Sequence, residues 1–105
     1  MRVRFEMSGG YGGLYAVEPL NTEVDSEALP EVERDDLVQM ARAAMASVPV
    51  PEQPEMTPDL MSYRLEIIDG DHWEVVLDDR TVPEDVWPLI EYMQATAIQR
   101  RLEQQ

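Results

Sequence analysis

The fold is decided by the stretch MSYRLEIIDGDHWEVVL, residues 61–77. Apolar and polar side chains alternate on both sides of its centre, which is the period of a half-buried strand. Asp69-Gly70-Asp71-His72 joins the two halves, and an Asp-Gly dipeptide is typical of a tight turn. The stretch therefore predicts a β-hairpin with one apolar face, and it places His72 in the turn.

A second alternation opens the chain. Between Met1 and Met7, Val3, Phe5 and Met7 alternate with charged residues, which predicts another half-buried strand. Leu14 to Val24 is also extended in character, but Pro19 interrupts it. Because proline lacks an N–H group, this second strand is expected to be short or to lie at a sheet edge.

Two helices are expected from apolar residues at three- and four-residue spacing. The first runs from about Pro30 to Ser47, with an apolar stripe made of Leu37, Met40, Ala41, Ala44, Met45 and Val48. The second begins at Thr81-Val82-Pro83-Glu84, which fits a capping box, and Pro88 marks a kink or a fresh start. Its stripe consists of Val86, Leu89, Ile90, Met93 and Ala97.

These elements predict a single α+β domain over residues 1–105, with an antiparallel sheet of about four strands and two main helices on one face. Four prolines between 49 and 59 indicate a stiff connector rather than a ligand motif. The tail from about 99 to 105 is expected to fray.

The composition excludes several classes of partner and of catalytic chemistry. The net charge of −14 would repel nucleic acid and anionic membrane surfaces, and no apolar run is long enough to span a bilayer. The chain has no cysteine and no lysine, which excludes thiolate metal sites, Schiff-base chemistry and a Walker-type phosphate loop. We expect a cytoplasmic protein.

The sequence offers little for catalysis. His72 is the one imidazole, and it reads most simply as an exposed loop residue. Four aspartates could gather around a cation, but their spacing does not match a calcium loop, and a solvated acidic rim is the simpler interpretation: Asp69, Asp71, Asp78 and Asp79. We therefore expect no catalytic residue, no metal, no cofactor and no enzyme.

Four of the five glycines flank Tyr11 directly after the first strand, in the segment from Ser8 to Gly13. One interpretation is a tight hairpin turn. The other is a loop that presents a binding surface, because two glycines would suffice for a turn and loops on rigid scaffolds often carry binding residues. Spacing alone leaves the two interpretations even.

The chain resembles emfourin, a proteinaceous inhibitor of thermolysin-like zinc metalloproteases, and its bacterial relatives. The resemblance rests on ordered blocks: a strand running into Ser8-Gly9-Gly10-Tyr11-Gly12-Gly13, then Asp25-Ser26-Glu27-Ala28-Leu29-Pro30, then Asp59-Leu60-Met61-Ser62-Tyr63. It spans about Arg2 to Tyr92. Tyr11 stands where the family usually has Phe and Gly12 where it often has Ala, departures that bear on the target protease more than on the fold.

The resemblance implies an inhibitor that occludes the active-site cleft of such a protease with a loop made of Ser8, Gly9, Gly10, Tyr11, Gly12, Gly13 and Leu14. Tyr11 or Leu14 would fill the specificity pocket, although the Tyr11 ring could equally pack over its own sheet. The protein would be a monomer when free. The alternative is an acidic interaction or adaptor module with no protease target, for which scattered carboxylates give no ordered array.

Overall fold

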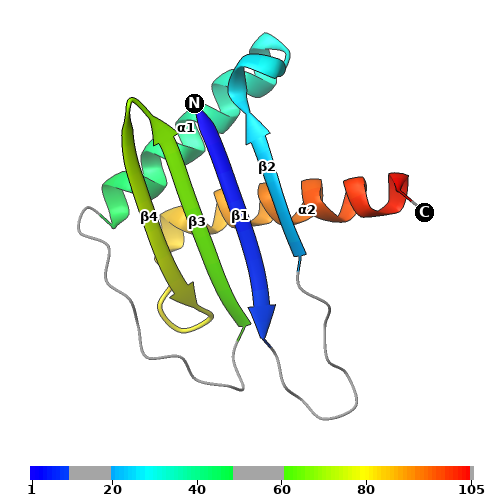
Figure 1. Ribbon diagram of the computed structural model, residues 1–105. Helices are drawn as coiled ribbons and strands as arrows, with labels where there is room; N and C mark the ends of the chain where they lie inside the picture. The colour runs from blue at the N-terminus through cyan, green and yellow to red at the C-terminus, as the bar shows by residue number, and fades with distance from the viewer. Residues whose placement is uncertain (10–19, 49–60, 105) are drawn as a thin grey trace.

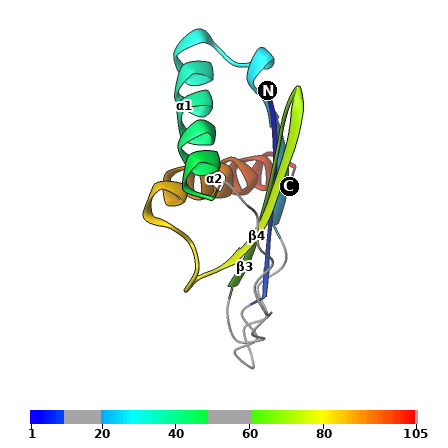
Figure 2. The same ribbon diagram turned by 90° about the vertical axis from the view of Figure 1, so that its left-hand side faces the viewer.

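Two hairpins build a four-stranded antiparallel sheet in the computed structural model, which describes residues 1–9, 20–48 and 61–104. The strands are β1 (Arg2–Gly9), β2 (Leu20–Asp25), β3 (Met61–Asp69) and β4 (Asp71–Asp78), in the sheet order β2-β1-β3-β4 (Figure 1). The helices α1 (Glu31–Ser47) and α2 (Trp87–Glu103) both cover one face of the sheet (Figure 2). This arrangement confirms the predicted α+β class.

Strand β1 lies between β2 and β3 and pairs with both. Val3 stands opposite Val24 on one side and Ile67 on the other, so all three side chains reach the helix-covered face. Strands β2 and β3 run parallel to each other on either side of β1, which makes β2, α1 and β3 a split β-α-β unit. The predicted edge position of the second strand is confirmed, and its described part begins at Leu20.

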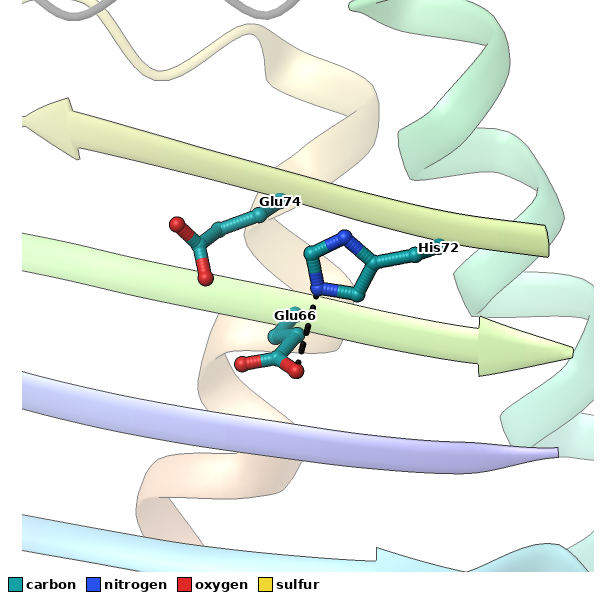
Figure 3. A group of neighbouring side chains, drawn as sticks. All are labelled: Glu66, His72 and Glu74. Carbon is teal, nitrogen blue, oxygen red and sulfur yellow. Dashed lines mark ion pairs between the residues drawn. The ribbon is translucent and has the colours of Figure 1, made fainter.

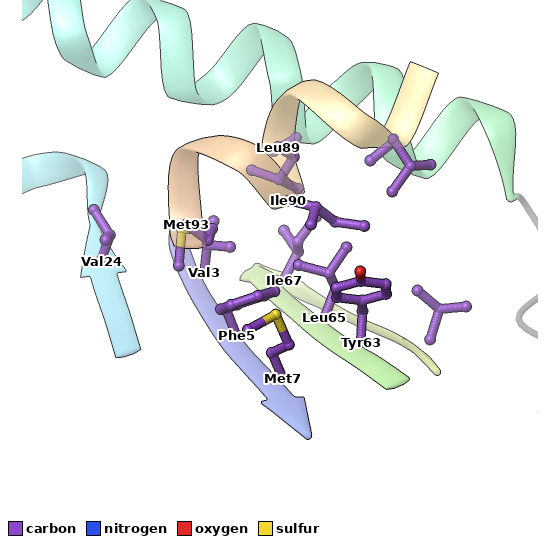
Figure 4. Packing of buried hydrophobic residues seen from close by; sticks show 14 of the residues in the cluster. Val3, Phe5, Met7, Val24, Tyr63, Leu65, Ile67, Leu89, Ile90 and Met93 are labelled. Atoms are coloured by element: carbon purple, nitrogen blue, oxygen red, sulfur yellow. The ribbon is translucent and has the colours of Figure 1, made fainter. Parts of the chain in front are cut away.

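The core fills the space between the sheet and the helices (Figure 4). The sheet supplies alternate residues, as the period of two predicts: Val3, Phe5, Met7, Leu20, Val24, Tyr63, Leu65, Ile67, Val75 and Leu77. The helices supply the residues of the predicted stripes: Leu37, Ala41 and Ala44 from α1, with Leu89, Ile90, Met93 and Ala97 from α2. Met40, Met45 and Val48 pack against this core while partly exposed, so the methionine stripe of α1 is core packing.

The predicted capping box is wrong. A separate 3-10 turn, η2 (Glu84–Val86), precedes α2, and neither of the two elements has a side-chain hydrogen bond at its N-cap. The Thr81 hydroxyl instead accepts from the backbone N–H of Asp78, because the chain is still completing the turn after β4. Pro88 occupies the first turn of α2, where its missing N–H costs nothing, so the alternative of a fresh start is confirmed.

Helix α2 extends to Glu103 and thus includes most of the segment expected to fray. Arg100 in this last part reaches back to β2 and donates to the Thr22 hydroxyl at 2.6 Å. The proline-rich connector, expected at about 49–59, lies outside the described residues. Among the described helices, neither has the length and apolar character needed to cross a bilayer.

Replacing Leu65 by alanine should lower the free energy of unfolding by about 2–5 kcal/mol, because its side chain is buried in the middle of the sheet. Urea unfolding followed by circular dichroism measures this. Val32→Ala on α1 is the control, since that side chain is 73% exposed and should change stability by less than about 0.5 kcal/mol. Equal losses in the two variants would contradict the assignment of the core.

Candidate functional site

Strand β1 carries the predicted binding segment at its C-terminal end. Of the seven residues proposed there, Ser8 and Gly9 belong to β1, and residues 10–14 lie outside the described residues. Ser8 pairs with Ser62 and Gly9 with Met61, so both are held by the neighbouring strand β3. Gly9 has a φ angle of 106°, a conformation that L side chains rarely adopt. A glycine is therefore required where the chain leaves the sheet.

Strand pairing brings together the two ends of the segment from 10 to 19, which connects β1 to β2. Met7 pairs with Leu20, so the chain leaves β1 and re-enters the sheet on the adjacent strand. Arg100 of α2 fastens the middle of β2, donating to the Thr22 hydroxyl and, at 2.5 Å, to the backbone carbonyl of Glu23. The ends of the segment from 10 to 19 are thus fixed by two strands and by a helix.

A buried tyrosine strengthens the same end of the sheet. Tyr63 of β3 donates its hydroxyl to Asp79 Oδ1 at 2.6 Å, and the other oxygen of Asp79 accepts from the backbone N–H of Met61 at 3.2 Å. The Tyr63 ring also meets Trp87 edge-on, with 5.6 Å between ring centroids. Because Met61 pairs with Gly9, Asp79 holds the strand against which the predicted binding segment begins.

Burial, followed by the hydrogen bond and the negative charge of Asp79, raises the pKa of Tyr63 well above its ordinary value. The alternation of residues 61–77 predicted that Tyr63 lies on the apolar face of its strand. The sequence did not indicate that Asp79 accepts its hydrogen bond, because this contact depends on how the chain turns after β4. Asp79 was interpreted only as part of an acidic rim.

The four aspartates considered for a cation do not come together. Asp69 and Asp71 flank the hairpin turn, whereas Asp78 and Asp79 lie at the opposite end of β4. Asp78 is buried, and its Oδ1 accepts from the backbone N–H groups of Arg80 and Thr81, so it closes a turn.

The helix-free face of the sheet carries paired charges alongside the half-buried Ile68 and Val76. Arg4 of β1 contacts Glu23 of β2 at 3.2 Å and Glu66 of β3 at 3.5 Å. Arg64 of β3 donates to Glu74 of β4 at 3.0 Å, and this contact lowers the pKa of Glu74. Water and salt screen such exposed pairs, so they contribute little to stability, and this face is solvated rather than a second core.

His72 does not lie in the turn. It belongs to β4, because Gly70 alone, with a φ angle of 77°, connects β3 to β4. The imidazole lies on the helix-free face, with Nε2 3.1 Å from Glu66 Oε1 (Figure 3). The turn was predicted too long because aspartates on both sides of the glycine are themselves typical turn residues.

Comparison with models of known protein families shows which family this chain matches. The family model named Emfourin matches residues 5–94, from the middle of β1 to the middle of α2. The chain belongs to the emfourin family. Comparisons with curated proteins and with solved structures found no match.

Membership of the emfourin family indicates a role as a protease inhibitor and argues for a binding protein rather than an enzyme. The match includes the paired strands at the base of the segment from 10 to 19, together with Tyr63 and Asp79. The paired strands and the Tyr63–Asp79 contact that support the predicted binding segment therefore lie within the matched residues, whereas Arg100 lies beyond them.

Replacing Tyr63 by phenylalanine should lower the free energy of unfolding by about 1.5–3 kcal/mol near neutral pH, because Asp79 loses a charge-assisted hydrogen bond. The raised pKa in the folded state means that this stabilisation is fully present below the unfolded-state value of 10.0 and decreases as the pH rises above it. The difference between the two proteins should therefore shrink above that pH.

Denaturant unfolding at a series of pH values measures this difference. Ultraviolet titration of the phenols, compared between the parent and Tyr63→Phe, shows whether the tyrosine that is removed is the one that ionises last. A constant stability difference across the alkaline range would contradict the assignment.

Proposed function

We propose that the chain inhibits thermolysin-like zinc metalloproteases by placing residues 8–14 in the active-site cleft. The observation that carries the proposal is the emfourin match over residues 5–94, which includes the strand that leads into this glycine-rich segment. An inhibitor must present backbone that pairs like a substrate, and glycines allow close approach of backbone to backbone.

The scaffold supports presentation of a preordered loop. The segment starts from the central strand β1, which is hydrogen-bonded on both sides, and not from an edge strand. A loop whose ends are already fixed loses less conformational entropy on binding, which increases affinity without added contacts. This favours the presenting-loop interpretation of the glycine segment over that of a simple turn.

Tyr11 or Leu14 would be the anchor of this interface. Both lie outside the described residues, so their roles are argued from chemistry. Proteases of this class favour a large apolar side chain beside the scissile bond. Buried aromatic anchors also dominate the binding energy of many interfaces. The strong negative charge of the chain would raise the association rate with a protease whose rim is basic or carries calcium.

The alternative is an acidic adaptor without a protease target. It would require an ordered array of unpaired carboxylates, but Glu23, Glu66 and Glu74 on the helix-free face are each paired with an arginine. The pairing of these carboxylates favours the inhibitor proposal over the adaptor.

The inhibitor proposal predicts that Gly9→Ala abolishes most inhibition while Gly70→Ala does not. Both glycines have positive φ angles, so each substitution should cost about 1–3 kcal/mol of stability by the same backbone mechanism. Only Gly9 stands at the end of the sheet that carries the proposed loop, and Gly70 turns the hairpin at the other end. Residual activity of a thermolysin-like protease, titrated with each folded variant, measures the difference.

Tyr11→Ala in the same titration should weaken inhibition by about 30-fold or more, the effect expected for a loss of about 2 kcal/mol at a binding hot spot. Retention of full inhibition by both Gly9→Ala and Tyr11→Ala would move the contact surface elsewhere. Failure of the parent protein to inhibit any of several such proteases would favour the adaptor.

A further inference from the structure

Three side chains with metal-binding atoms converge on the helix-free face of the sheet, away from the proposed inhibitory segment. They are Glu66 of β3 together with His72 and Glu74 of β4 (Figure 3). One ligand atom from each lies within 4.8 Å of the others. The group combines an imidazole with two carboxylates, a set typical of divalent transition-metal sites.

Strand register explains why these residues meet. Glu66 stands directly opposite Glu74, and His72 stands opposite Ile68, two residues further along β3. Residues two apart on a strand share one face, so all three side chains leave the sheet on the same side. Their backbones are fixed by the β3–β4 ladder, which preorganises the group at no extra cost.

The spacing of the ligand atoms is compatible with a bound ion. His72 Nε2 and Glu66 Oε1 are 3.1 Å apart, close to the edge of about 3.3 Å that follows from metal–ligand bonds of about 2.0–2.1 Å in a tetrahedron. The Glu66 side chain is only 16% exposed and that of Glu74 27%, whereas His72 is open to solvent at 57%. Two carboxylates are thus held in place beside an accessible imidazole.

The charges of the group also favour a cation. Glutamates directly opposite each other on neighbouring strands repel, and a positive charge between them relieves that repulsion. Arg4 and Arg64 supply part of this compensation from the sides, contacting Glu66 at 3.5 Å and Glu74 at 3.0 Å. Hydrogen-bonded neighbours of this kind also orient carboxylates that bind metals.

We propose that Glu66, His72 and Glu74 form a binding site for one divalent transition-metal ion of the Zn²⁺ type. The ion takes the place between His72 Nε2 and Glu66 Oε1, with Glu74 as the third protein ligand and water completing the shell. A proton held on Nε2 passes to solvent when the metal binds. The imidazole selects Zn²⁺ over Mg²⁺ and Ca²⁺, which prefer oxygen ligands.

Isothermal titration of the intact chain with ZnCl₂ tests the site, together with nuclear magnetic resonance of the imidazole. The chain contains a single histidine and no cysteine, so the imidazole signal belongs to His72 without ambiguity and no thiolate competes for zinc. We expect saturable binding of one zinc ion with a shift of the His72 signals. Titration with MgCl₂ or CaCl₂ should leave those signals unchanged.

His72→Gln and Glu74→Gln should each weaken zinc binding by at least about tenfold, because each removes one of three protein ligands. Glu33→Gln is the matched control: it removes the same charge from the exposed surface of α1, which covers the opposite face of the sheet, and should leave the affinity unchanged. Circular dichroism confirms folding of each variant. Absence of saturable binding at millimolar zinc, or equal weakening by Glu33→Gln, would overturn the proposal.

Discussion

The pairing of β1 with β2 on one side and with β3 on the other is the constraint on which the rest of the structure depends. Side chains alternate between the two faces with a period of two, so a slip of one residue would turn Val3, Phe5 and Met7 away from the helices. The same register places Gly9 beside Met61 at the end of the sheet. One pattern of strand pairing therefore sets both the core and the starting point of the proposed binding loop.

Periodic features of the sequence predicted most of this fold. The four strands, the order of the helices and the buried stripes follow from the spacing of apolar residues, because burial on one face imposes that spacing directly. Capping and turn details were less predictable: Thr81 has the right neighbours for a capping box but is used to close the turn after β4. His72 was placed in a turn because its flanking residues favour one, whereas β4 already begins at Asp71.

Contacts between side chains from different parts of the chain could not be predicted from the sequence. Tyr63 and Asp79 meet through the path of the chain after β4, and Glu66 meets His72 through cross-strand register. The spacing of these residues in the sequence does not identify either pair. Any of the 22 acidic residues could have been the partner of Tyr63 or of His72. The candidate loop was recognisable for the opposite reason: its four glycines lie within the five residues from Gly9 to Gly13, and no tertiary information is needed to notice them.

The two ends of the sheet are built differently, and this bears on how an inhibitor scaffold of this kind works. At the hairpin end, Gly70 reverses the chain alone and no atom lies near the position that a side chain would take. At the other end, Asp79 and the β1–β3 ladder hold the backbone where the proposed binding segment leaves β1, and Arg100 from α2 fastens the middle of β2. The strands that carry the proposed segment are therefore held by contacts from outside that segment, as presentation of a loop to a partner requires. The core residues that the structure describes lie on the strands and helical elements, so relatives can keep this packing while their loops differ in sequence.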